Sequence, residues 1–339
     1  MELAAAFNRF DSSGVKRVKK IYSLQVEGDV RLVFDVTYAN ERRLAVKFAD
    51  NSFTTPERIA GWHDLIERYN KAGIYAPRIV KTCDGLLCFS FSQYLVFAEE
   101  FKKYRAADEF RPKVEAFEYE EARYKMIGKI AALPQKTLPW NSPYCLYDTF
   151  SDDDLTDENY ECAAGWCGLF KKLVPERKET IEEIWQIYLK IRAELKEDYK
   201  KLPKTAFQAD QNQTNILLDA NRRFVGILDF NIAGTETILN YCLCEAVPYV
   251  RTKDLGKLAE PEFLQRQDQI LKRRLDLIQE HYSFSQAEKD LFPLLYNMVV
   301  PFRWPTYSCF REAAKKGKEH NLRMIDWVNY QIRRSDLKL

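Results

Sequence analysis

The spacing of apolar residues changes near residue 102, and this change constrains the fold more than any other feature of the chain. Before it, apolar residues come in short runs separated by turn residues, which is typical of strands. After it, they recur every three or four residues, as on the buried face of a helix. The chain has 339 residues, more than one hydrophobic core usually supports. The sequence therefore predicts an α+β fold with two lobes, residues 1–101 and residues 102–339.

The first lobe is predicted to be a small antiparallel sheet with one helix. Strands are expected at residues 21–27, 31–38, 43–49, 78–82, 86–90 and 93–101. Gly28 and Asp29 are typical turn residues between the first two strands. A helix is expected from Pro56, because Thr55 can cap it and apolar residues then repeat at helical spacing as far as Gly73.

The second lobe is predicted to be mostly helical. Helices are expected at residues 119–133, 175–202, 261–279, 286–300 and 310–334. The exception is residues 216–230, where two apolar runs flank the turn-prone residues 219–223. That arrangement is typical of a β-hairpin.

Composition excludes several classes of protein. Lys plus Arg number 52 and Asp plus Glu number 50, so no overall field attracts nucleic acid or an anionic membrane. No run of 18 apolar residues occurs and the N-terminus does not resemble a secretion signal, which indicates a cytoplasmic protein. The eight cysteines form no C-x-x-C pair, so a structural zinc site is not expected. The oligomeric state stays unknown.

Three polar residues in the hairpin region form a pattern with chemical meaning. Residues 207–231 read F-Q-A-D-Q-N-Q-T-N-I-L-L-D-A-N-R-R-F-V-G-I-L-D-F-N. If the turn centres on residues 221 and 222, antiparallel pairing places Asn215 roughly opposite Asp229. A carboxylate and an amide oxygen can hold Mg²⁺, and a second carboxylate, Asp210, can orient or deprotonate a hydroxyl. The alternative is that Asp210 caps a turn, Asn215 ends the loop and Asp229 ends a strand.

Four segments together resemble a known family. Q-A-D-Q-N-Q-T-N at 208–215 is similar to the motif H-x-D-x-x-x-x-N of the aminoglycoside phosphotransferase and choline kinase group, and G-I-L-D-F at 226–230 is similar to its I-D-[WF] segment. Lys47 in R-L-A-V-K-F-A resembles the phosphate-binding lysine of strand three, and A-G-I-Y-A-P-R-I at 72–79 resembles the link that follows the first helix. The resemblance spans residues 28–245 and implies a bilobal, protein-kinase-like fold.

The resemblance also implies cofactors and roles for individual residues. It implies a site for ATP and Mg²⁺, in which Lys47 contacts the phosphates and Gly28 belongs to the phosphate loop. The lysine is expected to pair with a glutamate of the first helix, and of Glu57 and Glu67 we favour Glu57. Main-chain groups from Glu99 to Phe101 are expected to meet the adenine. Asp210 is then the catalytic base, and Asn215 and Asp229 are the metal ligands.

The departures from the family pattern leave alternatives open. Gln208 stands where the family usually has histidine, a residue that braces the loop, and an amide can still form hydrogen bonds there. The expected activity is transfer of the γ-phosphate of ATP to a hydroxyl of a small molecule, such as an aminoglycoside, a choline-like amine, a sugar or an amino alcohol. The alternatives are an inactive kinase-like binding protein and a protein kinase.

Two further features bear on the acceptor. Acidic residues cluster at 152–161, which suits a polyamine acceptor but also an ordinary solvated loop. Trp166, Trp185 and Trp304 suit a quaternary ammonium but also ordinary core packing.

Overall fold

The computed structural model describes residues 2–339 and forms two compact units. The sheet unit comprises the residues up to Glu120 together with Ser151–Asp153 and Gln208–Ala233. The helical unit comprises Glu121–Phe150, Asp154–Phe207 and Gly234–Leu339.

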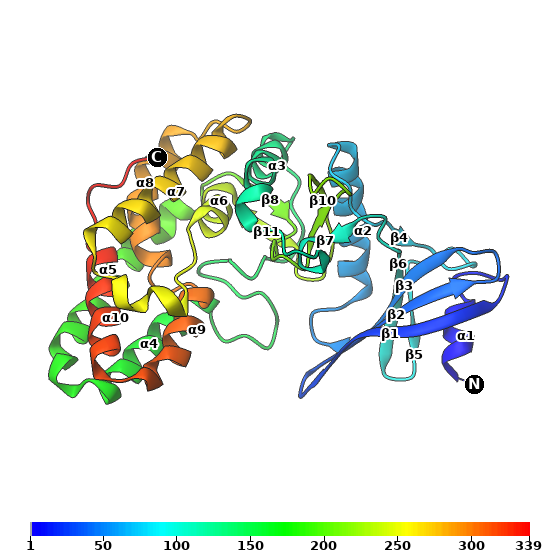
Figure 1. The fold of residues 1–339 in the computed structure, drawn as a ribbon, viewed down its shortest axis with the longest axis horizontal. Coiled ribbons are helices and arrows are strands. Elements are labelled where there is room, and N and C mark those ends of the chain that lie inside the picture. The colour runs from blue at the N-terminus through cyan, green and yellow to red at the C-terminus, as the bar shows by residue number, and fades with distance from the viewer. Residues whose placement is uncertain (1) are drawn as a thin grey trace. The chain divides into compact units, whose positions relative to one another are not determined.

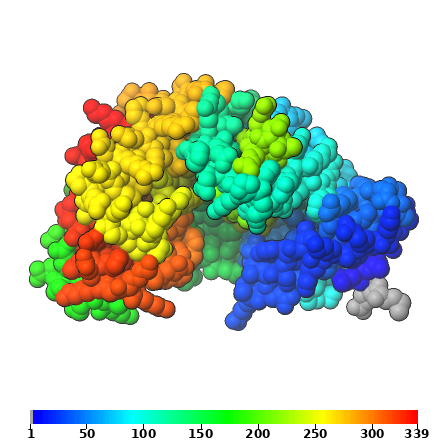
Figure 2. Space-filling model, in the orientation of Figure 1, coloured from blue at the N-terminus to red at the C-terminus, as the bar shows by residue number. Residues whose placement is uncertain are grey.

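An antiparallel sheet of six strands dominates the sheet unit (Figure 1). Its strands are β1 (Val15–Val26), β2 (Asp29–Tyr38), β3 (Arg43–Asn51), β4 (Ile79–Val80), β5 (Cys88–Phe91) and β6 (Tyr94–Glu100). They are arranged in the order β1-β2-β3-β6-β4, with β5 also paired to β6. The predicted meander of three strands is therefore confirmed, although β1 begins earlier than residue 21. β1 is an edge strand whose side chains are mostly exposed, and it contributes to the blue surface in Figure 2.

A helix covers each face of this sheet. On one face, Phe7 and Phe10, at the end of α1 (Glu2–Asn8) and just beyond it, pack with Phe34 and Phe48 in one hydrophobic cluster. On the other face lies α2 (Pro56–Lys71), whose Trp62 ring centre is 6.0 Å from that of Phe97 in β6. Alternate residues of a strand point to opposite faces, so Val46 and Phe48 face α1 while Lys47 faces the other way. α2 begins as predicted, with Thr55 accepting a hydrogen bond from the Arg58 amide.

The remainder of the sheet unit holds the hairpin region. A second sheet joins β7 (Arg105–Ala106) to β9 (Ile216–Leu218) and β9 to β10 (Phe224–Ile227). The 3-10 helices η1 (Ala107–Glu109) and η2 (Ala116–Glu118) follow β7. Tyr75, just after α2, forms a parallel bridge with Gly226. The hairpin is thereby attached to the chain that follows α2.

The helical unit contains eight α-helices among the described residues. They are α3 (Glu120–Ala132), which begins at the last residue of the sheet unit, α4 (Glu158–Leu173), α5 (Lys178–Tyr199), α6 (Ile238–Ala246), α7 (Pro261–Gln279), α8 (Gln286–Val299), α9 (Trp304–Ala313) and α10 (Lys318–Gln331). Its other elements are the two paired strands β8 (Lys204–Phe207) and β11 (Gly234–Thr237) and the 3-10 helices η3 (Pro175–Arg177), η4 (Thr252–Lys257) and η5 (Ala314–Lys316). None of the helices formed by residues 2–339 is long and apolar enough to span a membrane.

Several boundaries differ from the sequence-based expectations. The helix expected at 310–334 is interrupted at Gly317, whose φ of +114° is a backbone conformation that breaks a helix. α4 was not predicted, because its first turn lies in the acidic cluster and its interior contains Gly165 and Gly168. Gly165 lies against the Tyr307 ring, so the missing side chain makes room for a helix contact.

The division into units also differs from the predicted lobes. The predicted boundary follows residue 101, whereas residues 102–120 and the hairpin Gln208–Ala233 group with the sheet. Strand pairing explains the difference, because β7 is bonded to β9 and Tyr75 to Gly226. The residues of the hairpin and the residues of the sheet thus belong to one unit.

Candidate functional site

The hairpin β9–β10 positions the polar residues singled out from the sequence, with a register that differs slightly from the expected one. Ile216 pairs with Ile227, and the Leu228 amide donates to the Asn215 carbonyl at 2.9 Å. Asn215 therefore lies opposite Leu228, and the predicted pairing with Asp229 is wrong by one residue. A turn centred on residues 221 and 222 gives the observed register, and the irregularity between Phe224 and Gly226 is needed to reach it from the Phe224–Leu218 pair.

Gln208 braces the loop between β8 and β9. Its side-chain Nε2 lies 2.9, 3.0 and 2.7 Å from the carbonyl oxygens of Asp210, Leu228 and Asp229, and its Oε1 accepts from the Asp210 amide at 2.9 Å. The side chain is fully buried. One amide side chain therefore ties Asp210 to Asp229, the two carboxylate residues singled out from the sequence. Glutamine thus forms the bracing contacts that the sequence comparison expects from histidine.

Backbone strain accompanies this bracing. Ala209 and Asp229 both have positive φ, +64° and +63°, although neither is glycine. Residues with a side chain seldom adopt this conformation, and such residues cluster at functional sites where the surroundings hold them in place. Hydrogen bonds between the buried Gln208 side chain and the main chain of Asp210, next to Ala209, and of Asp229 itself stabilise both residues in this conformation.

The Asp210 carboxylate is oriented by two amide side chains. Asn215 Nδ2 donates to Oδ2 of Asp210 at 2.8 Å and to its carbonyl oxygen at 3.0 Å. Asn212 Nδ2 donates to Oδ1 at 2.7 Å. Asn215 uses its side-chain nitrogen on Asp210, and its Oδ1 accepts a long contact from the Thr214 hydroxyl at 3.4 Å. Asn212 was not singled out from the sequence, because an exposed amide in a loop gives no distinctive pattern.

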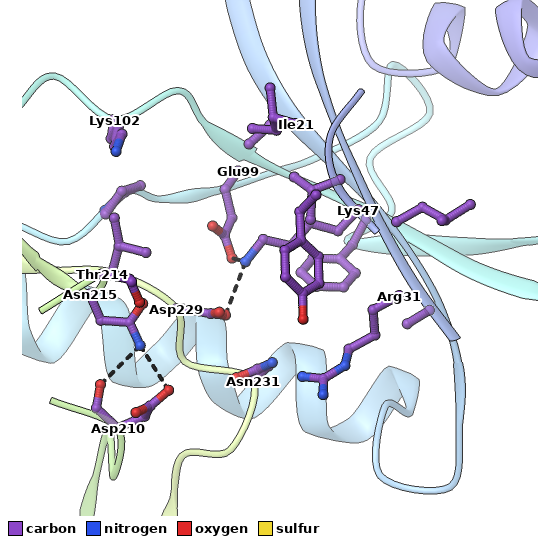
Figure 3. Close-up of a pocket in the computed structure, with 18 of the residues that line it drawn as sticks. Ile21, Arg31, Lys47, Glu99, Lys102, Asp210, Thr214, Asn215, Asp229 and Asn231 are labelled. Carbon is purple, nitrogen blue, oxygen red and sulfur yellow. Dashed lines mark hydrogen bonds and ion pairs between the residues drawn. The ribbon is translucent and has the colours of Figure 1, made fainter. Parts of the chain in front are cut away.

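Lys47 lies between two carboxylates (Figure 3). Its Nζ is 2.8 Å from Oε1 of Glu99 and 3.3 Å from Oδ1 of Asp229. The side chains of Lys47 and Glu99 are only 15% and 9% exposed. Burial alone would lower the pKa of the Lys47 ammonium, but the charges of Asp229 and Glu99 outweigh it and raise that pKa. The lysine is therefore a fixed positive charge in this site.

The predicted partner of Lys47 is wrong. Glu57 is exposed at the N-terminal end of α2, and the other candidate, Glu67, forms an ion pair with Arg78 at 2.8 Å. No acidic residue is among the buried residues of α2, whereas Glu99 lies on β6, the strand next to that of Lys47. From the sequence, only the main chain of Glu99 was expected at the site, and the contact of its side chain with Lys47 was not predicted.

A cavity of about 660 Å³ opens beside these groups. Lys47, Glu99, Phe101, Asp210, Asn215 and Asp229 all line it. Its apolar wall includes Ile21, Val33, Ala45, Leu228 and Ile232. The cavity thus has an apolar part, suited to a flat base, and a polar end with the Lys47 ammonium and several carboxylates.

Two predicted cofactor contacts need correction. Gly28 occupies the turn between β1 and β2 with φ +76° and is not among the residues that line the cavity. The amide groups of Glu100 and Phe101 donate to the carbonyls of Arg78 and Arg43, so these two N–H groups are already engaged. A base in the cavity would have to bind other main-chain groups of this segment.

Arg31 and Asn231 also line the cavity and were not predicted. β2 and β3 pair so that Val33 is opposite Lys47 and Arg31 opposite Ala49. Arg31 is therefore on the same face of the sheet as Lys47, and the register of the predicted meander contains that signal. For Asn231 no such signal exists, because it lies beyond the hairpin.

The residues considered for the acceptor have mixed environments. Asp157 caps α4 and is buried in an ion pair with Arg192, so it has a structural role. Burial and the nearby Glu161 and Asp154 raise the pKa of Glu158 to about 7. Of the three tryptophans, Trp166 is fully buried while Trp304 is 43% exposed; Trp185 stacks on Tyr188.

The sequence model of the phosphotransferase enzyme family (APH) matches residues 25–239, well over half of the chain. This chain belongs to that family. The matched segment contains Lys47, Glu99, Asp210, Asn215 and Asp229, so the residues that meet at the cavity all lie in the part the family shares. The resemblance inferred from the sequence motifs is confirmed.

Solved structures of phosphotransferases share the fold. The spectinomycin phosphotransferase APH(9)-Ia, in complex with ADP and spectinomycin, is 11% identical, with a TM-score of 0.52 over 97% of this chain and 98% of its own. APH(2'')-IIa, in a ternary complex with streptomycin and ATP, is 12% identical, with a TM-score of 0.50 over 98% of this chain and 97% of its own. These likenesses confirm the predicted kinase-like α+β fold. A search of curated proteins gave no match.

Proposed function

We propose that this chain transfers the γ-phosphate of ATP to a hydroxyl group of a small molecule. The observation that carries the proposal is the meeting of Lys47, Asn215, Asp210 and Asp229 at one cavity with an apolar wall. Membership of a phosphotransferase family supports it. Two relatives of the same fold bind ATP or ADP together with an antibiotic, which supports a small acceptor rather than a protein.

The residues present fit a magnesium ion. Mg²⁺ prefers oxygen ligands, and one or two carboxylates usually hold it together with the phosphates of a nucleotide. Asp229 supplies a carboxylate and Asn215 an amide oxygen that its own nitrogen does not need. Lys47, Glu99 and Asp229 together carry one positive and two negative charges, and this net negative charge favours the binding of a cation. When bound, the ion would neutralise charge on the β- and γ-phosphates.

The apolar part of the cavity receives the base, and Lys47 binds the phosphates. The ammonium remains charged at every working pH, because the neighbouring carboxylates raise its pKa. Its role is electrostatic: it holds the phosphate chain in line and offsets the negative charge that the ADP leaving group acquires.

Asp210 binds and deprotonates the acceptor hydroxyl. Asn212 donates to one carboxylate oxygen of Asp210 and Asn215 donates to the other, and a carboxylate oxygen can accept more than one hydrogen bond. In the transfer, a bond forms between the acceptor oxygen and the γ-phosphorus, and the bond from that phosphorus to the β,γ-bridging oxygen breaks. The hydroxyl proton passes to Asp210, and ADP leaves with the bridging oxygen.

Turnover on a pooled panel tests this proposal. The purified chain is incubated with ATP, Mg²⁺ and pools of aminoglycosides, choline-like amines, sugars and amino alcohols, and ADP formation and the mass of each acceptor are measured. ADP formation with one phosphorylated pool is the expected result. Binding of ATP without turnover on any pool favours the inactive binding protein, and labelling of added proteins but of no metabolite favours a protein kinase.

A further inference from the structure

α2 offers no carboxylate to Lys47. The helix contains three acidic residues, Glu57, Asp64 and Glu67. Glu57 is exposed, Asp64 is exposed and contacts its neighbour His63 at 3.4 Å, and Glu67 is paired with Arg78. On the inward side the helix presents an aromatic ring, because Trp62 packs against Phe97, the residue opposite Lys47 on β6. An ion pair between α2 and the lysine is therefore absent from the described residues.

Glu99 takes that place from within the sheet. β3 and β6 are neighbouring antiparallel strands in which Ala45 pairs with Glu99 and Lys47 with Phe97. Phe97, opposite Lys47, lies on the same face of the sheet as Lys47, and so does Glu99, which is two residues further along β6. The side chains of Lys47 and Glu99 therefore both point into the cavity (Figure 3). The contact of 2.8 Å thus depends on strand register, which the main-chain hydrogen bonds of the sheet fix.

Asp229, the second carboxylate beside Lys47, cannot serve both the lysine and a metal ion equally well. Asp229 lies 3.3 Å from the ammonium and is also the residue suited to a metal ion. A cation bound to Asp229 would weaken the attraction between the Asp229 carboxylate and the Lys47 ammonium. Glu99 is then the remaining partner that holds the ammonium beside the phosphates.

We propose that Glu99 is the positioning residue for Lys47, so that the phosphate-binding lysine is held by the sheet and is independent of α2. This inference rests on the proposed function, because it concerns the lysine of the same nucleotide site. The expected ion pair between Glu57 of α2 and Lys47 is thus replaced by one between Glu99 of β6 and Lys47 of β3, within one sheet. Movement of α2 consequently leaves the lysine in place.

The first test compares two isosteric substitutions. Glu99→Gln removes the charge next to Lys47 but keeps an oxygen acceptor, and Asp229 still compensates the buried ammonium. The matched control is Glu67→Gln, which removes another ion-paired glutamate of the same unit, on α2. Glu99→Gln is expected to lower kcat/KM for ATP by about 10- to 100-fold, the usual effect of losing a partner that orients a functional group. The control is expected to retain wild-type kcat/KM.

The second test asks whether Glu99 acts through Lys47. In a double-mutant cycle with Lys47→Met, Glu99→Gln is expected to cause no further loss once the lysine is absent. Independently of turnover, the rate at which an amine-reactive reagent acylates Lys47 at one fixed pH is followed by mass spectrometry in the wild type and in Glu99→Gln. The rate is expected to rise in the variant, because the ammonium loses the partner that lies 2.8 Å away. Urea unfolding verifies that each variant is folded.

The outcomes separate this inference from the proposed function. Additive losses in the cycle, or wild-type activity and an unchanged rate of Lys47 acylation in Glu99→Gln, would overturn the role of Glu99. If the wild type neither binds ATP nor phosphorylates any acceptor, the proposed function fails. The rate of Lys47 acylation still decides in that case whether Glu99 holds Lys47.

Discussion

At the scale of single residues, Gln208 has an unusual task for a glutamine. Its Nε2 lies within 3.0 Å of three carbonyl oxygens, and its two N–H groups donate hydrogen bonds that these three acceptors share. The amide does not titrate, so the brace keeps its strength across the pH range in which a histidine would change charge. The loop geometry around Asp210 should therefore contribute no pH limit of its own.

Gln208→Glu tests the brace through its pH dependence. At pH 7 the introduced carboxylate faces three carbonyl oxygens, so its pKa in the folded chain rises above the unfolded value of about 4.3. The variant should therefore differ least from the wild type below pH 4, and its stability relative to the wild type is lost as the pH rises through the folded pKa. We expect a loss of about 1–3 kcal/mol at pH 7, measured by urea unfolding. The control Gln213→Glu should change stability by less than about 0.5 kcal/mol. Equal stability of the two variants at pH 7 would contradict the bracing role.

At the scale of elements, the turn between β2 and β3 depends on one buried carboxylate. Asp11, after α1, accepts hydrogen bonds from the Ser13 amide and from Asn40 and Arg42 of the turn. A hydrogen bond with the Ser13 side chain is the largest cause of the lowered pKa of Asp11, which is about 2 despite burial. The carboxylate thus ties the end of the N-terminal helix to the sheet.

Asp11→Asn is expected to destabilise the chain by about 1–2 kcal/mol at pH 7. A lowered folded pKa means that the stabilisation is complete above the unfolded pKa of about 3.9 and disappears as the pH falls toward 2. The difference between wild type and variant should therefore shrink between pH 4 and pH 2. Urea unfolding across this range measures it, and a difference that is constant with pH would contradict the assignment.

The attachment of β10 depends on the absence of a side chain at Gly226. A Cβ atom there would lie 1.8 Å from the Tyr75 carbonyl oxygen, which accepts from the Ile227 amide. Gly226→Ala should therefore cost about 1–3 kcal/mol or more in the free energy of unfolding. Gly168→Ala, in α4, meets no atom within 4 Å and should instead gain about 0.5–1 kcal/mol. Thermal unfolding that moves in the same direction for both variants would contradict this reading.

The site was predictable where function depends on short sequence spacing. Asp210, Asn215, Asp229 and Lys47 were found because the first three lie on one loop and hairpin, and because an apolar strand with one lysine fits a family pattern. Strand pairing between distant segments was not predictable in the same way. Glu99 faces Lys47 only because β6, 52 residues further on, pairs with β3 in one particular register.

At the scale of the whole molecule, the class of fold followed from apolar periodicity, but the grouping of segments did not. The hairpin Gln208–Ala233 is close in sequence to helices, yet it groups with the sheet through β7 and Tyr75. Two-residue strands such as β7 leave no periodic trace. The residues proposed to bind the nucleotide and the metal ion, and the proposed catalytic base Asp210, therefore all lie in the sheet unit.

The most direct test of that account separates ATP binding from transfer in Asp210→Asn. Mg·ATP affinity and phosphate transfer to the acceptor found in the panel are measured side by side in the wild type and the variant. Loss of a catalytic base is expected to reduce transfer by about 100- to 10,000-fold, while the affinity for Mg·ATP stays within about threefold, because Lys47, Asn215 and Asp229 remain. Transfer by the variant at the wild-type rate, or a wild type that does not bind Mg·ATP, would contradict the account.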